Sequence, residues 1–519
     1  MIKKLTLAIL ITVTGLSGCA VNPVTGERNF QIYGSEWEQQ VGAQMYAPMK
    51  QSQGGEFVLD PELTQYVQHV GQQLADRARR KNELDFEFAI LNDSTPNAWA
   101  LPGGKIVINR GLLTELDSEA ELAAVLGHEI VHADAAHGAR AQSKGVLTQI
   151  GAVVSMVVLG SVDSRATREI AMIVPALGAQ LLTQKYSRDA ELEADKYGML
   201  YLSEAGYNPL GAVDLQQTFV ALSEDRNADW MSGLFASHPP SQERLERNRK
   251  MAGELPEGGR IGAAAYKEKM HYLRRVKPAY AAFDEANKAA SEDDLDLAQR
   301  KLNQAMAIEP RESLFHSLQG DIYALKKKPQ LALTSYQKAI ENNPGFFYGY
   351  LRKGQMEYKQ DQLQAARSDL SSSLDLMPTA EAHYLLGKMD KEAGQLDSAT
   401  EHFRIAAQSS SESGQQAQRE IMSQDLLKNP SRYVSSRAEI DENYRVWIRF
   451  ENLTTVSMKD IEISYAWLDE QGQTRKGKID YKGPLPGKKQ DRVRTTVRLE
   501  NAGDLERRVR VQITAASIE

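Results

Sequence analysis

Hydrophobic residues change their spacing along the chain, and the changes divide it into three regions. In the first region apolar residues recur three and four apart, for example over residues 61–79, which is typical of a helix with one buried face. Residues 86–91 and 105–109 alternate instead, as strands do. From Tyr433 onward the spacing is two. The pattern predicts a mainly α domain with a small sheet at the start and a β domain at the end.

The middle region repeats with a period of 34 residues, which is the period of tetratricopeptide repeats. Small residues at fixed places let paired helices pack closely, and stacked pairs build an α-solenoid with a concave groove. The region resembles the tetratricopeptide family, and the resemblance implies a groove that binds peptide or protein segments. A plain spacer is the alternative. The residues that keep the period are Pro310, Pro344 and Pro378, then Gly320 and Gly354, then Ala298, Ala332 and Ala366.

In the last region, alternating stretches are separated by turn residues, Asn452 and Gly472 among them. Strands of this kind indicate a small C-terminal β-sandwich. We find no catalytic pattern here and assign the domain to partner binding or placement. The predicted strands cover residues 444–450, 461–468, 493–499 and 509–518.

The N-terminus has the pattern of an export signal. A basic start precedes an apolar run over residues 5–16, which is too short to span a bilayer. Leu16-Ser17-Gly18-Cys19 then resembles a bacterial lipobox. The resemblance implies removal of residues 1–18 and acylation of Cys19, and Ala20 implies the outer membrane, with the functional parts in the periplasm. The alternative is an ordinary secretory signal that leaves a free thiol.

The strongest chemical pattern is His128-Glu129-Ile130-Val131-His132. Two histidines four apart lie on one helix face and can occupy adjacent corners of a tetrahedral zinc site, while the glutamate points to the open corner where a water would sit. Ser118 and Glu121 look like a capping box before an apolar stripe, so we expect a half-buried helix. A polar helix face with two solvated histidines is the alternative.

The third ligand must come from elsewhere in the chain. No acid occurs between Asp134 and Asp163, so the glutamate that a thermolysin-like site needs is missing, and the metzincin spacing after His132 is missing too. The next dense acidic group contains Glu191 and Asp195, four apart on one helix face. One of them can bind metal while the other orients a ligating histidine. A solvated acidic helix start is the alternative.

These motifs in combination resemble the HtpX/BepA-type zinc metallopeptidases over about residues 35 to 250. The resemblance implies one Zn²⁺ per chain, held by His128, His132 and Glu191, with Glu129 as general base. Asp195 is implied to support a ligand, and Glu193 is the rival third ligand. The stretch 97–104 resembles the segment beside the family's active site, and a strand there is a natural edge for an extended peptide. A plain structural hairpin is equally compatible. The implied substrate-edge residues are Asn97, Ala98, Gly103 and Gly104.

Ser237-His238-Pro239-Pro240 resembles the His-Pro loop of the same family. The resemblance implies that His238 can occupy the open zinc position and silence the enzyme, since another imidazole would displace the water. Transition-state stabilisation or loop packing are the alternatives. His137, five residues after His132, is expected to face away from the metal and to be structural.

Two apolar stretches follow the zinc motif, at residues 145–162 and 170–182. Both approach the length of a membrane span, but they contain glycine and polar residues. They could be embedded in the membrane, buried in the core, or dipping into the membrane surface. We favour the last two because the lipid anchor already holds the protein.

Composition narrows the remaining choices. A chain of 519 residues is too long for one core, and it carries a net charge of −7 and a single cysteine. A disulfide or a thiolate zinc site is therefore not expected. Without a basic cluster, nucleic acid is not expected as a partner either.

The sequence thus predicts a multidomain protein. We expect a periplasmic zinc endopeptidase that cleaves misfolded or assembly-stalled envelope proteins, with outer-membrane proteins or their assembly machinery as partners of the repeats. A latched assembly factor acting through its repeats, and zinc-dependent hydrolysis of a lipid or small amide, are the alternatives. The expected parts are a signal peptide at 1–18, a tether at 19–35, a mainly α zincin-type metallopeptidase domain with a small sheet at 36–252, a linker at 253–278, an α-solenoid of tetratricopeptide repeats at 279–425 and a β-sandwich at 430–519.

Overall fold

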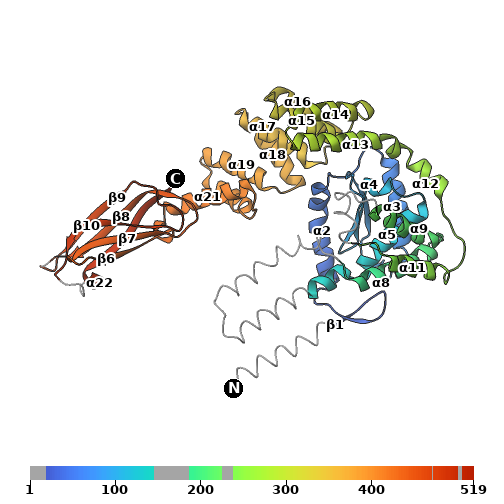
Figure 1. Cartoon of the computed structure of the whole chain (residues 1–519), viewed down its shortest axis with the longest axis horizontal. Helices are drawn as coiled ribbons and strands as arrows, with labels where there is room; N and C mark the ends of the chain where they lie inside the picture. The colour runs from blue at the N-terminus through green and yellow to red at the C-terminus, as the bar shows by residue number, and fades with distance from the viewer. Residues whose placement is uncertain (1–18, 145–185, 225–237, 470, 501–504) are drawn as a thin grey trace, which may run out of the picture. The chain divides into compact units, whose positions relative to one another are not determined.

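A computed structural model describes residues 19–144, 186–224, 238–469, 471–500 and 505–519. The chain forms two compact units, Met1–Met377 and Pro378–Glu519. The first unit contains the zinc motif and six helices of the repeat region, and the second contains the remaining repeat helices and the β domain (Figure 1). The predicted signal peptide at 1–18 lies outside the described residues.

The small sheet of the first unit has the strand order β3-β5-β4. Strand β5 (Lys105–Asn109) is central, with β3 (Glu87–Leu91) parallel and β4 (Ala98–Leu101) antiparallel to it. Every residue of β5 is buried. Because strand residues alternate between the two faces of a sheet, both faces of this sheet are covered. One face packs on helix α2 (Ser35–Ser52), and the other joins the large core that contains α3 (Pro61–Ala75) and the zinc-motif helix (Figure 1).

The zinc motif lies on helix α5 (Glu119–Asp134). The helix begins as predicted, since the Ser118 side chain accepts from the Glu121 N–H at 3.1 Å. The expectation of a half-buried helix was wrong, because every residue of α5 is buried. Helices α3, α8 (Arg188–Glu204) and α9 (Leu210–Glu224) and strand β4 surround it.

Helix α8 crosses α5 at the zinc motif because both helices carry a glycine at the crossing. A Cβ built on Gly198 would lie only 3.1 Å from the backbone N of His128, and one on Gly127 would lie 3.2 Å from the Gly198 carbonyl oxygen. This approach brings Glu191 and Asp195 of α8 next to the histidines of α5. Helix α11 (Gln242–Ala252) packs on α8 and α9 and follows His238 directly in the chain.

The segment that we expected to be a tether is folded onto the first unit. Strands β1 (Cys19–Val21) and β2 (Arg28–Phe30) form an antiparallel hairpin in which Cys19 pairs with Phe30. Val24, in the turn, is buried in the large core. The N–H of Ile32, after the hairpin, donates to Ser143 Oγ at 2.9 Å.

The segment at 253–278 is helical and packed rather than an extended linker. It contains α12 (Ala263–Lys269) and the first turns of α13 (His271–Ser291), and the fully buried Tyr266 donates its hydroxyl to the Leu113 carbonyl at 2.7 Å. The guanidinium carbon of Arg110, the residue directly after β5, lies 3.3 Å from the centroid of the Tyr280 ring on α13. The metallopeptidase and repeat regions therefore share one core in this unit.

The repeats pair helices as the period predicted. The helices are α13, α14 (Leu295–Ile308), α15 (Ser313–Leu325), α16 (Pro329–Asn342), α17 (Phe347–Lys359) and α18 (Leu363–Leu376). In the pairs α15–α16 and α17–α18 a glycine admits a large side chain of the next helix: a Cβ on Gly320 would meet the Tyr336 ring at 2.3 Å, and one on Gly354 would meet Leu370 at 2.8 Å. The predicted tetratricopeptide architecture is confirmed.

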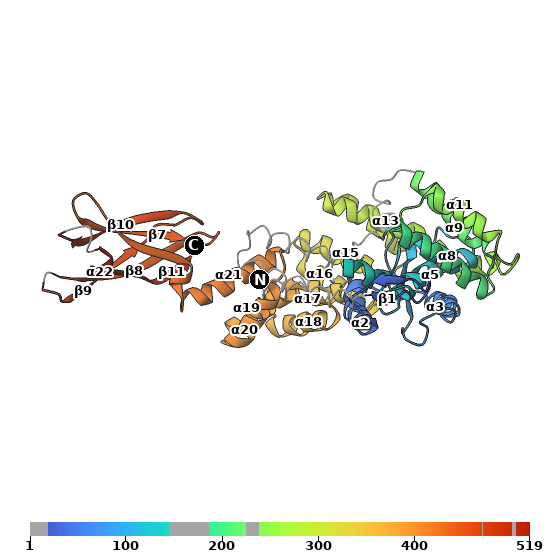
Figure 2. The ribbon, with the colours of Figure 1, turned by 90° about the horizontal axis from the view of Figure 1, so that it is seen from below.

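The second unit begins with three helices, α19 (Ala380–Glu392), α20 (Leu396–Ala406) and α21 (Glu412–Leu426). Two three-stranded antiparallel sheets follow, ordered β10-β7-β6 and β11-β8-β9, and they enclose an apolar core (Figure 2). The predicted β-sandwich is confirmed, but two of its strands, β6 and β9, were missed. The strands are β6 (Val434–Ile440), β7 (Arg445–Asn452), β8 (Met458–Leu468), β9 (Thr474–Tyr481), β10 (Gln490–Arg498) and β11 (Val509–Ile518).

The apolar stretches at 145–162 and 170–182 lie outside the described residues. Among the residues that are described, we find no helix with the length and apolar character of a membrane span.

Candidate zinc site

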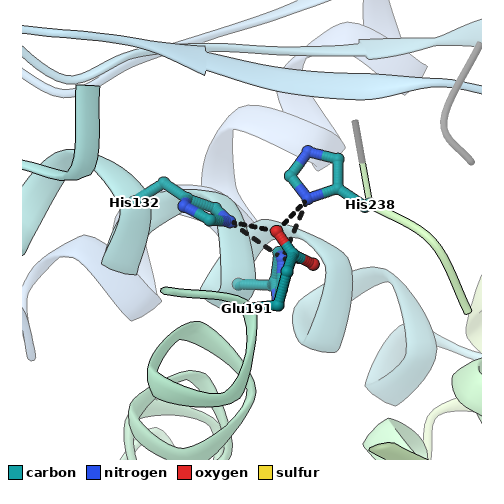
Figure 3. Close-up of side chains that lie close together, drawn as sticks. His132, Glu191 and His238 are labelled. Atoms are coloured by element: carbon teal, nitrogen blue, oxygen red, sulfur yellow. Dashed lines mark hydrogen bonds and ion pairs between the residues drawn. The ribbon is translucent and has the colours of Figure 1, made fainter. Parts of the chain in front are cut away.

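Four buried side chains from three parts of the chain converge on one point. His128 and His132 come from α5, Glu191 from α8, and His238 from the segment before α11, with all four ligand atoms within 4.8 Å of one another. His132 Nε2 lies 3.0 Å from His128 Nε2, and His238 Nδ1 lies 3.3 Å from His128 Nε2. Glu191 Oε1 lies 2.9 Å from His238 Nδ1 and 3.4 Å from His132 Nε2 (Figure 3).

These spacings fit a tetrahedral zinc ion. Ligand atoms at zinc's usual distances from a common centre lie about 3.3 Å apart, which is the spacing seen here. Three imidazoles and one carboxylate also form a donor set that zinc prefers. Without a cation or added protons, the lone pairs of the ring nitrogens and of the carboxylate oxygen would face one another in a buried site, which is unfavourable.

Glu129 lies beside this cluster with a free carboxylate oxygen. The side chain is 1% exposed, and its Oε2 has no hydrogen-bond donor among the described residues. Its Oε1 lies 3.6 Å from His238 Nε2. Burial raises the pKa of Glu129 above its ordinary value, and the nearby His238 and His128 imidazoles oppose that rise. A buried carboxylate without a donor is suited to receive a proton.

Asp195 and Arg244 orient His128 from the Nδ1 side of its ring, away from the other ligand atoms. Asp195 Oδ1 lies 3.0 Å from His128 Nδ1, and Arg244 donates Nε and Nη2 to the two Asp195 oxygens at 2.7 Å each. Arg244 Nη1 also lies 2.9 Å from Glu191 Oε2. Burial would raise the pKa of Asp195, but the Arg244 charge and hydrogen bonds outweigh it and hold that pKa below its ordinary value. The carboxylate thus stays ionised and orients the imidazole.

Glu193, the rival third ligand, points away from the four-residue cluster. Its Oε1 lies 3.3 Å from His137 Nε2 and accepts from Asn22 Nδ2 at 2.6 Å. His137 Nδ1 in turn lies 2.8 Å from His132 Nδ1. As expected, His137 is not among the converging ligand atoms, but it contacts the ligand His132 on the side opposite the cluster.

Tyr186, which sequence reasoning missed, also borders the site. Its ring stacks on His132, with the ring centroids 3.8 Å apart and an angle of 21° between the ring planes. It also lies 5.5 Å from the His238 ring by centroid distance. Its position directly before Ser187, the N-cap of α8, is the sequence signal that could have identified it.

The predicted substrate edge is strand β4 and the turn after it. Beyond its pairing with β5, β4 has no other strand partner in the part of the chain that the structure describes. The Asn97 carbonyl accepts from the Asn109 N–H at 2.8 Å, which begins the hairpin, and Ala98 is buried. Gly103 and Gly104 form the turn with φ of 85° and 89°, a conformation that favours glycine.

An apolar pocket opens beside Glu129 and His128. Helices α5, α8, α9 and α11 line it, with few polar groups apart from those of the site. Its apolar lining comes from Ala124, Val125, Met199, Leu215 and Phe219.

Comparison with known proteins agrees with this geometry. Residues 61–252 match the family described as Peptidase family M48. The chain is 26% identical over 403 residues to the beta-barrel assembly-enhancing protease of Escherichia coli K12, covering 68% of this chain and 81% of that protein. It is 34% identical over 161 residues to the mitochondrial metalloendopeptidase OMA1 of Arabidopsis thaliana, 31% of this chain and 30% of that protein.

A third similar protein is the metalloprotease YcaL of Escherichia coli K12, which is 30% identical over 168 residues, 32% of this chain and 63% of that protein. The matched residues include α5 and α8, which carry His128, His132 and Glu191.

Proposed function

Because the chain carries a zinc metalloendopeptidase domain of peptidase family M48, we propose that it cleaves misfolded or assembly-stalled outer-membrane proteins in the bacterial envelope. The observation that carries the chemistry is the donor-free Glu129 carboxylate beside four convergent zinc-ligand atoms. The substrate class is supported by the name of the beta-barrel assembly-enhancing protease, which is similar over 68% of this chain.

The mechanism assigns a separate task to each side chain. His128, His132 and Glu191 would hold the ion, which supplies Lewis acidity when bound. Glu129 takes the proton of the attacking water and passes it to the leaving amine. Asp195 fixes the His128 ring by accepting from its Nδ1, and Arg244 keeps Asp195 in place.

The open edge of β4 offers a way to present the peptide. An extended segment that pairs with β4 would receive main-chain hydrogen bonds that do not depend on its sequence. Such pairing suits a substrate that is unfolded, because folded β-strands already have partners. Asn97 and the Gly103-Gly104 turn shape this edge rather than contact the reacting bond.

The repeats would choose the client. A hollow on their surface is lined by α15, α16 and Lys353 of α17, with polar residues such as Gln319 and Lys338. We assign this hollow to docking of envelope proteins or of their assembly machinery. The lipid on Cys19 would keep the enzyme at the periplasmic face of the outer membrane, near clients that insert there.

His238 fits the role of a latch. Its Nδ1 stands at the fourth corner of the ligand set, 2.9 Å from Glu191 Oε1, where the reacting water must bind. Movement of this residue would open the site. The second candidate function, an assembly factor that rarely cleaves, rests on the same observation, because a permanently closed latch leaves only the repeats to act.

The test uses the full chain in detergent, with an unfolded outer-membrane barrel protein and an unfolded soluble protein of equal length as substrates. We expect faster cleavage of the barrel protein, and faster cleavage of both by His238→Ala. Lys338→Glu should reduce only the preference for the barrel protein, whereas Lys359→Glu, exposed on α17, should not. Zinc-loaded wild type and His238→Ala that both leave the barrel protein intact would favour the assembly-factor function.

A further inference from the structure

A chain of polar contacts runs from the N-terminal hairpin to a zinc ligand. Asn22 Nδ2 donates to Glu193 Oε1 at 2.6 Å, and this oxygen lies 3.3 Å from His137 Nε2. His137 Nδ1 lies 2.8 Å from His132 Nδ1. Asn22, His137 and His132 are each at most 2% exposed, so water competes little with these contacts.

Zinc ligation determines which ring nitrogen carries the proton in each histidine of this series of contacts. His132 would bind the ion through Nε2, the atom that lies among the other ligand atoms, so its proton sits on Nδ1. That N–H can only donate to His137 Nδ1, which places the His137 proton on Nε2, facing the Glu193 carboxylate. Each contact then places a potential donor opposite an acceptor, and Glu193 Oε1 also accepts from Asn22 and lies 3.5 Å from Arg140 Nη1.

The hairpin holds Asn22 firmly in this place. Asn22 Oδ1 accepts from the N–H of Val24 at 2.9 Å and of Thr25 at 3.3 Å, which closes the turn. Val24 is buried in the large core. Beyond the hairpin, the Ile32 N–H donates to Ser143 Oγ, and that hydroxyl donates to the Ala139 carbonyl at 2.7 Å. The hairpin thus contacts α8 through Glu193, and Ile32 just after it contacts the segment that follows His137.

We propose that the hairpin that begins at Cys19 positions the zinc ligand His132 through Glu193 and His137. The position of this N-terminal hairpin then determines the zinc affinity of the site. This inference rests on zinc binding at the proposed catalytic site. His137, Glu193 and Asn22 are positioning residues that act through His132. Asn22 is three residues from Cys19, so a lipid attached at Cys19, as proposed above, would lie close in the chain to the residue that contacts Glu193.

The first test measures zinc affinity of the full chain by competition with a chelator, together with the absorption spectrum of the cobalt-substituted protein. His137→Ala should weaken zinc binding by about 10- to 100-fold and shift the cobalt bands, as removal of a ligand's partner does. His137→Gln, whose amide oxygen can still accept from His132, should recover part of the loss. Equal affinity of His137→Ala and wild type would overturn the proposal.

The second test addresses the hairpin. Asn22→Asp keeps the oxygen that closes the turn but replaces the donor to Glu193 with a negative charge, and we expect about 3- to 10-fold weaker zinc binding. Asn29→Asp makes the same charge change on strand β2 of the same hairpin and should leave affinity unchanged. Equal affinities of the two variants would overturn the role of the hairpin. Circular dichroism of the zinc-free proteins shows that both are folded.

These readouts separate this inference from the proposed function. If zinc-loaded wild type cleaves no protein, the proposed function fails, while the affinities of the variants still decide the role of the hairpin. If wild type cleaves and the variants bind zinc like wild type, the proposed function stands and this inference is wrong.

Discussion

Arg244 donates two hydrogen bonds of 2.7 Å to Asp195, and both residues are buried next to the zinc ligand His128. Because the guanidinium is planar and forked, lysine cannot reproduce this geometry. We predict that Arg244→Lys lowers zinc affinity by about tenfold or more, since His128 loses its fixed orientation. Chelator competition measures the change.

A matched control lies on the surface of the same domain. Arg188 pairs with Glu243 by two guanidinium nitrogens as well, but its side chain is 66% exposed. Exposed pairs contribute little to stability because solvent screens them. Arg188→Lys should therefore leave zinc affinity unchanged. If both substitutions weaken zinc binding equally, the buried pair has no special role.

Gly198 is predicted to be intolerant of a side chain. Its added Cβ would lie 3.1 Å from His128 N and 3.2 Å from Gly127 C, which are backbone atoms that cannot move independently of α5. Gly198→Ala should push α8 away from α5, with a loss of about 1–3 kcal/mol in the free energy of unfolding and weaker zinc binding. Chemical denaturation and chelator competition measure the two effects.

Gly253→Ala serves as the control for that substitution. Gly253 follows α11 with a φ of −75°, and its added Cβ would approach nothing closer than 3.5 Å. We expect unchanged zinc affinity and unchanged or slightly raised stability. A loss at Gly253 as large as that at Gly198 would show that the α5–α8 crossing is not the cause.

The helix pair α19–α20 should lose stability in acid. His383 Nδ1 lies 2.9 Å from His402 Nδ1, and burial, together with the charge of His402, lowers the pKa of His383 below its ordinary value of 6.5. In the unfolded chain His383 takes up its proton near pH 6.5, whereas in the folded chain it does so only at lower pH. The contribution of the neutral His383 to the free energy of unfolding is therefore fully present above pH 6.5 and is lost as the pH falls below 6.5.

Hydrogen exchange of α19 and α20 tests whether this helix pair loses stability as the pH falls. Between about pH 7.5 and pH 5.5, protection corrected for the intrinsic rate should fall more in wild type than in His383→Gln. His69→Gln, an exposed histidine on α3, should behave as wild type does. An identical fall in wild type and His383→Gln would contradict the prediction.

The sequence predicted those parts of the site that depend on local spacing. The four-residue spacing of His128 and His132 puts both on one helix face wherever the helix lies. Local spacing does not decide between Glu191 and Glu193. Residues two apart on a helix point in nearly opposite directions, so only one of the two can face the histidines. Which one faces the histidines depends on how α8 is rotated, and the contact of Gly198 with α5 sets that rotation.

Long-range contacts explain the other differences. Helix α5 was expected to be half-buried because the sequence shows one apolar stripe, but distant residues satisfy its acids Glu119 and Asp134 and so allow the other face to be buried as well. Tyr66 and Tyr207 donate to Glu119, and the backbone N–H groups of Arg79 and Arg80 donate to Asp134. A sequence pattern does not reveal such partners.

The missed strands have a physical reason of their own. Strands β6 and β9 are edge strands, as β10 and β11 also are, but β6 has a single buried residue, Val434, and β9 is largely exposed and rich in charge, with Arg475, Lys476 and Lys478. Charged residues on an edge prevent pairing with other chains, and they also weaken the alternating pattern by which strands are recognised. The four strands that were predicted keep a clear apolar face.

The role of Glu129 as general base is tested by comparing the full chain with Glu129→Gln, each loaded with one zinc ion, on an unfolded protein substrate. Counting new N-termini at internal peptide bonds, we expect cleavage by wild type and at least about a hundredfold less by Glu129→Gln, because the amide cannot accept the proton. Glu246→Gln, exposed on α11, should cleave as wild type does. Equal cleavage by zinc-loaded wild type and Glu129→Gln would contradict the account.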